Sequence, residues 1–324
     1  MVKNKFKSKK KHNESSLLKK KTVLIGLGNI GLNYDLNEKS VITHSKSIIK
    51  NSKLKFICGI DKSKKQRKIF EKKYFIKTLP KLKNDTLLAK TSFVVISTPN
   101  KTHLNLIKKI VTFRKVKDIL LEKPGGANLK DFEKIVKLCK KNKINLYINY
   151  HRLYDKNYSI VKKLLLSMKK FTGIASYSRG LDNNCSHILT LLNCFNLRRF
   201  KIKILRRGKD PDFLIKFDKG KIFFFNNPRK NISNNEFEIV GDNLKIKSKD
   251  QMNEFDVFNI EKDNYIKDNY IFSNKSKNIK FDKKNSQKVV LDNIFNKKRG
   301  KNISKITEIS YNSFKIIDKI KSLI

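Results

Sequence analysis

Three glycines at a fixed spacing are the first residues of this sequence whose types suggest chemistry. Gly26-Leu27-Gly28-Asn29-Ile30-Gly31 follows directly after the apolar run Val23–Ile25. Glycines at this spacing let the backbone approach a phosphate, and the N–H groups at the start of the following helix bind its oxygens. The motif is weak alone but much stronger at the end of the first strand of a βαβ unit. It predicts that Gly26, Gly28, Asn29, Ile30 and Gly31 bind a dinucleotide.

A carboxylate after the second apolar run would complete such a site. Asp61 ends that run, where the motif places an acid for the ribose hydroxyls, but it follows Gly31 by 30 positions instead of about 20. The surplus is a polar insertion, residues 33–40. The carboxylate would repel a 2′-phosphate and favours NAD, whereas the basic side chains behind it would attract that phosphate: Lys62, Lys64, Lys65 and Arg67. NAD is therefore the favoured cofactor, and NADP stays open.

The elements that must position these residues follow from the alternation of the first half. Short apolar runs are separated by longer stretches with helical spacing, such as Phe132, Ile135, Val136 and Cys139. Strands that alternate with helices predict βαβ units and a parallel sheet covered on both faces. We expect a dinucleotide-binding Rossmann domain over residues 21–150, with strands at Val23–Ile25, Leu54–Ile60, Phe93–Ile96, Ile119–Leu121 and Ile144–Ile148.

The second half, residues 151–324, has a different pattern. Lysine-laced, strand-like runs predict an antiparallel or mixed sheet with one open face. The runs are Lys201–Leu205, Phe213–Phe217, Lys221–Phe225, Phe237–Val240 and Leu244–Ile246. The chain ends in an amphipathic helix expected over residues 303–324, because Ile306, Ile309, Ile316 and Ile320 share one stripe. The fold class is therefore α/β, with a second domain built on a separate sheet.

The charge is unusual but does not by itself specify a partner. The chain has 76 Lys+Arg against 28 Asp+Glu and a formal charge of +48. Only ten of the 76 are Arg, the residue that base-reading proteins concentrate. Abundant Lys, Asn, Ile and Phe are typical of an A/T-biased coding sequence, so no specific nucleic-acid partner is expected. Residues 1–20 are predicted to form a basic flexible tail.

The sequence lacks the features of membrane, secreted and metal-binding proteins. There is no uninterrupted apolar run of the length that a transmembrane helix needs, and the N-terminus has no apolar signal segment. The four cysteines show no CxxC pair and no metal-ligand spacing, so no metal is expected and the thiols read as reduced. The prediction is a cytoplasmic protein without a membrane partner.

Two further motifs indicate a family. Ser97-Thr98-Pro99-Asn100-Lys101-Thr102-His103 follows the run that ends at Ile96, and Glu122-Lys123-Pro124 follows the run that ends at Leu121. In this context the sequence resembles the Gfo/Idh/MocA family, the relatives of glucose-fructose oxidoreductase and inositol dehydrogenase. The resemblance runs from about Lys21 to the terminal helix. It implies a C-terminal α/β domain whose large open, mostly antiparallel sheet supports the substrate site and often the contact between subunits.

The resemblance also assigns roles to individual residues. The segment Gly180-Leu181-Asp182-Asn183-Asn184-Cys185-Ser186-His187 looks like the family's catalytic-histidine segment, so His187 would be the general acid/base and Lys123 would hydrogen-bond the reacting hydroxyl. Substrate contacts would come from Lys123, Arg152, Asn183, Asn184 and His187. Further cofactor contacts would come from Ser97, Thr98, Pro99, Asn100, His103, Glu122 and Lys123.

The implied activity is that of an NAD(P)-dependent oxidoreductase acting on a secondary hydroxyl or ketone of a sugar. The Asn-Asn-x-Ser-His motif, with Thr43-His44, is most similar to members of surface-polysaccharide pathways, which implies a sugar nucleotide or sugar acid as substrate. The family's C-terminal sheet implies a homo-oligomer, either a dimer or a tetramer. Two positions depart from the family: Asn183 and Thr190 stand where many members have Asp. Those losses favour the alternative, a non-catalytic dinucleotide- or sugar-binding protein of the same fold, whereas the retained Lys123 opposes it.

Overall fold

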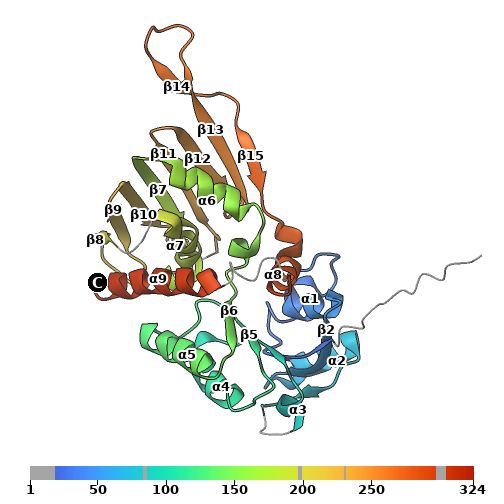
Figure 1. Cartoon of the computed structure of the whole chain (residues 1–324). Helices are drawn as coiled ribbons and strands as arrows, with labels where there is room; N and C mark the ends of the chain where they lie inside the picture. Colours follow the sequence, from blue (N-terminus) through green and yellow to red (C-terminus); the bar gives the residue numbers. More distant parts are fainter. Residues whose placement is uncertain (1–18, 83–85, 196–198, 230, 297–303) are drawn as a thin grey trace, which may run out of the picture.

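The computed structural model describes residues 19–82, 86–195, 199–229, 231–296 and 304–324. Within them the chain forms two sheets, one above the other in Figure 1, with the C-terminal helices between them. Most of the segment predicted as a tail lies outside the described residues, and Lys20 already opens the first strand. The expected fold class, a Rossmann domain followed by a large, mostly antiparallel sheet, is confirmed.

The first sheet has the strand order that binds dinucleotides. Its six strands are parallel in the order β3-β2-β1-β4-β5-β6, which places the end of β1 at the point where the strand order reverses. The strands are β1 (Lys20–Ile25), β2 (Leu54–Ile60), β3 (Thr78–Leu79), β4 (Phe93–Ile96), β5 (Asp118–Leu121) and β6 (Asn145–Ile148). All four residues of β4 are buried, as a strand covered on both faces requires.

Helices connect these strands, as the alternating pattern predicts. They are α1 (His44–Lys50), α2 (Lys64–Tyr74), α3 (Thr86–Ala89), α4 (His103–Ile110) and α5 (Leu129–Lys141), with short helical turns η1 (Asn33–Asp35) and η2 (Asn100–Thr102). In α5 the buried positions are Phe132, Ile135 and Cys139, three of those that indicated a helix. The five runs predicted as strands are all strands, and β3 was not predicted.

The second sheet has nine strands, ordered β14-β13-β12-β11-β7-β10-β9-β8, with β15 paired to β13. They are β7 (Phe171–Tyr177), β8 (Phe200–Arg206), β9 (Asp212–Phe217), β10 (Gly220–Asn226), β11 (Asn235–Gly241), β12 (Leu244–Lys249), β13 (Glu254–Lys262), β14 (Tyr270–Phe272) and β15 (Lys277–Lys280). All pairs are antiparallel except β7 with β10, which is parallel.

One face of this sheet is covered and the other is largely exposed. Figure 1 shows α6 (Tyr158–Ser167) and α7 (Ser186–Leu192) over one face. On the other face Ile174, Phe225 and Val240 are exposed by 53%, 39% and 40%. The expected open face is therefore present, and contact between subunits through it stays a prediction.

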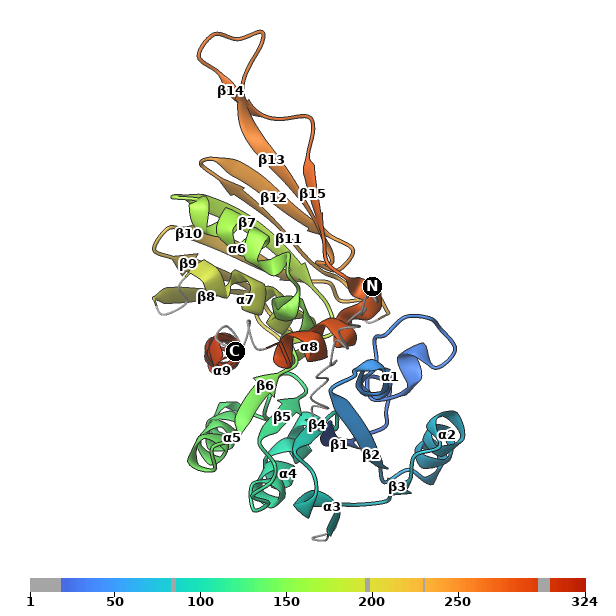
Figure 2. The same ribbon diagram turned by 45° about the vertical axis from the view of Figure 1, so that its right-hand side comes forward.

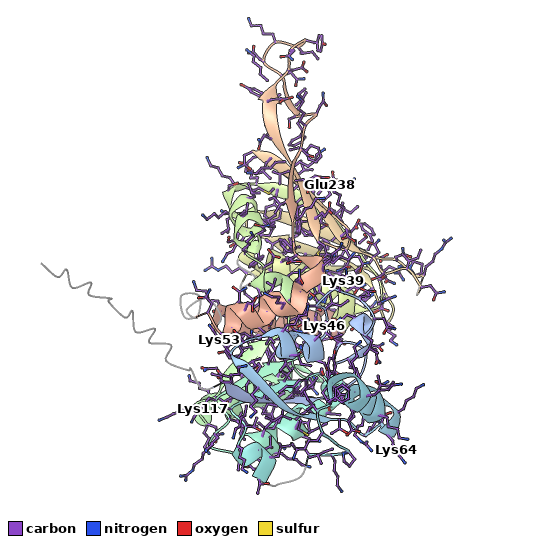
Figure 3. All side chains as sticks on the ribbon, turned by 90° about the vertical axis from the view of Figure 1, so that its right-hand side faces the viewer. Lys39, Lys46, Lys53, Lys64, Lys117 and Glu238 are labelled. Atoms are coloured by element: carbon purple, nitrogen blue, oxygen red, sulfur yellow. The ribbon has the colours of Figure 1, made fainter. Side chains whose placement is uncertain are left out.

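Two C-terminal helices join the halves of the molecule. The expected terminal helix is α9 (Ser304–Lys321), which packs on β6 and α5 of the first sheet and on α7 of the second. The other, α8 (Ser286–Ile294), packs on α1 and on the turn η3 (His151–Tyr154). Lys53, labelled with Lys39 and Lys46 in Figure 3, donates to the Phe295 carbonyl at the end of α8 at 2.7 Å. The two sheets thus share a packed boundary (Figure 2).

Candidate active site

The glycine loop after β1 leaves open space where a phosphate would lie. Gly26 has φ +100°, and a Cβ on Gly31 would lie 2.3 Å from the Gly26 carbonyl oxygen, so both positions need glycine for the turn itself. A Cβ on Gly28 would meet no atom within 4 Å. The loop is thus tight on its inner side and open at Gly28, which fits a bound dinucleotide.

The polar insertion explains the long interval between the glycines and Asp61. The N–H groups of His44 and Ser45 donate to the carbonyls of Ile30 and Gly31, each at 3.0 Å, so helical hydrogen bonding continues across the inserted segment. Buried Asp35 fixes that segment by accepting from the N–H groups of Ile42 and Thr43 at 2.7 and 2.9 Å. The insertion is therefore a folded excursion that does not displace the first helix from the glycine loop.

Asp61 lies at the end of β2, beside the glycine loop. Its Oδ2 accepts from the Leu27 N–H and its Oδ1 from the Ser63 N–H, both at 2.7 Å. Arg67 donates to the Asp61 carbonyl at 2.8 Å. A carboxylate oxygen has more than one lone pair, so Asp61 can still accept from ribose hydroxyls, while the Arg67 guanidinium lies close to the same place.

The loops after β4 and β5 are tied to the glycine loop and to each other. Ser97 Oγ donates to the Gly26 carbonyl at 2.7 Å. Both ring nitrogens of fully buried His103 face carbonyls, those of Gly125 at 3.1 Å and Thr98 at 2.9 Å. His103 thus supports the two loops from behind, whereas Ser97, Thr98, Pro99 and Asn100 follow β4 at the carboxyl edge of the sheet.

Glu122 is held in a buried polar network that the sequence did not predict. Its Oε1 lies 2.8 Å from His44 Nε2 and accepts from the Asn149 amide, which also donates to Gln287 Oε1 at 3.1 Å. Burial alone would raise the pKa of Glu122, but His44, Asn149 and Lys123 together lower it. His44 Nδ1 and Asn149 Oδ1 are buried without a hydrogen-bond partner. The residues come from four distant segments. The sequence singled out Glu122 and Thr43-His44 but did not show that they meet.

Lys123 points from the first sheet toward the segment that carries His187. Its Nζ donates to Asn183 Oδ1 at 3.2 Å across 60 positions of sequence. Asn183 lies in a π-helical turn, η4 (Leu181–Cys185), directly before α7. Burial lowers the pKa of Lys123, and nearby Glu122 and Asp182 oppose that shift. Wide helical turns of this kind are frequent at functional sites.

His187, at the second position of α7, sits in a cationic and aromatic environment. Its Nδ1 lies 3.5 Å from Arg152 Nη1, and its ring contacts those of Tyr150 and His151 at centroid distances of 5.4 and 5.8 Å. Burial first, then the charges of Lys123 and Arg152, hold the pKa of His187 well below the ordinary 6.5. The imidazole is therefore neutral near pH 7 and can accept a proton.

Arg152 is positioned by a turn from the second sheet. Its Nη2 and Nε donate to the carbonyls of Gln251 and Met252 at 2.7 and 3.2 Å. The consecutive residues Asp250, Gln251 and Met252 have φ of +46°, +55° and +62°, a left-handed conformation that is costly for residues other than glycine and concentrates at functional sites. This strained turn fixes a buried charge beside His187.

The remaining predicted residues have supporting contacts. Asn184 Nδ2 donates to Ser178 Oγ at 3.3 Å and Ser233 Oγ at 3.4 Å, so it holds η4 on the sheet. Thr190 Oγ1 donates to the His187 carbonyl at 2.9 Å and does not contact the ring. Of the predicted substrate contacts, the structure groups Lys123, Asn183, His187 and Arg152, and it turns Asn184 away from them.

The positions of Lys123 and His187 predict a pH profile for alcohol oxidation. Because both folded pKa values lie below their ordinary values, we expect a bell whose acid limb lies below pH 6.5 and whose alkaline limb lies below pH 10.5. Arg152→Gln removes a charge that lowers the pKa of His187, so the acid limb should move to higher pH.

Arg152→Lys keeps the charge and serves as the control, and circular dichroism checks that both variants fold. An acid limb of kcat/KM that stays in place in Arg152→Gln would contradict this account of His187.

No helix in the described part of the chain is long and apolar enough to cross a membrane. Among the same residues no group of three or more His, Cys, Asp or Glu side chains could hold a metal ion.

Comparison with known proteins extends these observations. A sequence search of curated proteins finds no match. The structure resembles UDP-N-acetylglucosamine 3-dehydrogenase GnnA from Acidithiobacillus ferrooxidans with a TM-score of 0.72 and 11% identity, covering 95% of this chain and 98% of that one. An oxidoreductase from Agrobacterium radiobacter, solved with NAD+, L-tartaric acid and magnesium, matches with a TM-score of 0.63 and 16% identity over 93% and 94%.

A dehydrogenase (MviM) from Clostridium difficile matches with a TM-score of 0.69 and 13% identity over 94% and 99%. At these identities the three structures support the two-domain fold. The family model described as "Oxidoreductase family, NAD-binding Rossmann fold" matches residues 20–150, the part that holds the glycine loop, Asp61 and Lys123. Residues 20–150 therefore match the NAD-binding Rossmann domain of the Gfo/Idh/MocA oxidoreductases, the family that the sequence motifs resemble.

Proposed function

We propose that this oxidoreductase transfers a hydride between NAD(P), with NAD favoured, and a secondary hydroxyl or the corresponding ketone of a sugar. The observation that carries the proposal is the meeting of Lys123 and Asn183, from different sheets, beside His187 and Arg152. Lys123 also follows β5 at the edge of the first sheet where the glycine loop lies. In a complex with a dinucleotide at the glycine loop, Lys123 and His187 would be the proton-carrying groups near the nicotinamide.

Lys123 and His187 have different proposed roles in handling the hydroxyl group. A bound nicotinamide supplies the hydride acceptor or donor. During oxidation the hydroxyl oxygen would accept a hydrogen bond from Lys123 Nζ, and neutral His187 would take the hydroxyl proton as the C–H electron pair leaves with the hydride. Asn183 would keep Lys123 directed at that oxygen. In the reverse direction His187 would return the proton.

For the substrate we propose a sugar nucleotide or a sugar acid, used in the synthesis of a surface polysaccharide. In support, the matched Acidithiobacillus protein is named as acting on UDP-N-acetylglucosamine, and the Agrobacterium protein was solved with L-tartaric acid, a hydroxy acid. A chain with a formal charge of +48 would also attract anionic substrates.

The test is turnover on a substrate panel. The full chain is incubated with NAD+ or NADP+ and with neutral sugars, sugar acids and sugar nucleotides, and formation of the reduced nicotinamide is followed by absorbance. The reverse reaction uses the corresponding ketones. We expect oxidation of an anionic sugar, faster with NAD+ than with NADP+. Tight cofactor binding without turnover on any member of the panel would instead favour the non-catalytic binding protein.

A further inference from the structure

Beside Asn183 the structure has a cavity of about 750 Å³. We call it the Arg179 cavity. It lies where η4, the β8–β9 turn, the end of β10 and the end of α9 meet; the end of α9 lies beside β8 and β9 in Figures 1 and 2. Its volume falls within the range of small-molecule sites, roughly 300–1,000 Å³. The charged residues that line it are Arg179, Asp182, Arg206, Lys209, Asp210 and Lys321.

A single side chain connects this cavity with the candidate catalytic lysine. Asn183 Oδ1 accepts from Lys123 Nζ at 3.2 Å, and Asn183 Nδ2 donates to the Arg179 carbonyl at 3.1 Å. Because Asn183 also lines the cavity, the cavity begins one side chain away from Lys123.

The charges of the lining leave two cations for a ligand. Arg206 is held by Asp212 through contacts of 2.8 and 3.0 Å, and Lys321 is held by Asp182 at 2.7 and 2.9 Å. In the described part of the chain, Arg179 and Lys209 form no ion pair. One further carboxylate, Asp210, faces the cavity, so the lining has four cations against two carboxylates.

The backbone that carries Arg179 is unusual. Arg179 has φ +59° and Gly180 has φ +94°. A Cβ on Gly180 would lie 3.2 Å from Asp210 Oδ1, so glycine lets the two walls approach. A left-handed conformation is costly for a residue other than glycine and persists where the surroundings impose it. The exposed Arg179 side chain thus lines the cavity from a constrained backbone.

We propose that the Arg179 cavity holds the phosphate groups at the non-reacting end of the substrate, with Arg179 and Lys209 as their ligands. Arginine pairs bidentately with phosphate oxygens, and lysine binds them as a point charge. Amide and carboxylate groups such as Asn226 and Asp210 suit the hydroxyls of an attached sugar. The inference rests on the proposed function, because it assigns the substrate's second anchor.

The experiment measures binding to the full chain saturated with NADH by calorimetry. The probes are UDP, glucose 1-phosphate and uridine, which differ in phosphate content and source. The test variant is Arg179→Gln/Lys209→Gln, and Arg114→Gln/Lys115→Gln removes the same two charges from an exposed turn of the first half. We expect the test variant to bind the phosphate-bearing probes at least roughly tenfold more weakly, the control to match the native chain, and uridine not to bind.

Tighter binding of UDP would assign the phosphates to a nucleoside diphosphate, and tighter binding of glucose 1-phosphate to a sugar phosphate. The proposal is overturned if neither binds, or if the test variant binds them as tightly as the native chain. If phosphate binding is lost in the test variant and no sugar is turned over, the dehydrogenase function is rejected and the Arg179 cavity remains a phosphate site. Turnover on a neutral sugar, with kcat/KM and phosphate binding both unchanged in the test variant, would reject the phosphate site and leave the dehydrogenase function in place.

Discussion

Gly28→Val is expected to abolish binding of NAD(P) while the protein stays folded. A Cβ at position 28 meets no protein atom within 4 Å, so the new side chain occupies only the space in front of the loop. That space is where the pyrophosphate would bind, and losing two or more charge-assisted hydrogen bonds weakens binding by roughly 100-fold or more. Fluorescence titration with NADH measures the loss, and thermal unfolding should show a midpoint close to that of the native chain.

Gly31→Ala is the matched variant, and it is expected to lower the stability of the fold. Its Cβ would lie 2.3 Å from the backbone oxygen of Gly26, so the loop must shift and the free energy of unfolding should fall by about 1–3 kcal/mol. Unchanged NADH affinity in Gly28→Val would show that the dinucleotide does not lie against this loop.

Lys123→Ala and His187→Ala should each lower kcat by roughly 10²–10⁴, the usual effect of removing a positioned acid or base. Cofactor affinity should change little, because the hydrogen-bond partners of both side chains lie outside the glycine loop: Lys123 contacts Asn183, and His187 contacts Arg152. Steady-state kinetics on the best substrate of the panel gives kcat, and NADH titration gives the affinity.

Lys130→Ala is the control, since it removes an exposed lysine from α5, close in sequence to Lys123 but outside the site. Full turnover in both test variants would reject the proton-transfer roles of Lys123 and His187. Loss in Lys123→Ala alone would assign the proton chemistry to the lysine and leave His187 as a packing residue.

The sequence by itself determined the Rossmann half. Five of its six strands contain short apolar runs, fully buried in β4 and β5, and Gly26-x-Gly28-x-x-Gly31 lies directly after the first of them, so local composition and order suffice for these elements. The terminal helix is equally local, because Ile306, Ile316 and Ile320 fall on one buried stripe. The Asp61 interval looked irregular only because hydrogen bonds from His44 and Ser45 across the insertion cannot be read from spacing.

The second sheet was only partly predictable. Strand β7, at its centre, was not among the predicted runs, because two of its four inward positions are the small residues Gly173 and Ala175. A Cβ on Gly173 would lie 2.9 Å from Ile239 of the neighbouring strand, so the weak hydrophobic signal is itself a consequence of close packing. The strands β13, β14 and β15 were likewise not predicted.

Only the tertiary structure decided the environment of the site. Glu122 is held by His44 and Asn149, and Arg152 by a turn a hundred positions later in the chain. The pKa shift of His187 has the same origin, since burial and charges from other segments produce it. Side-chain periodicity records which face of an element is buried. It carries no information about which distant segment supplies the buried partner, and those partners set the charge and orientation of Lys123, Glu122 and His187.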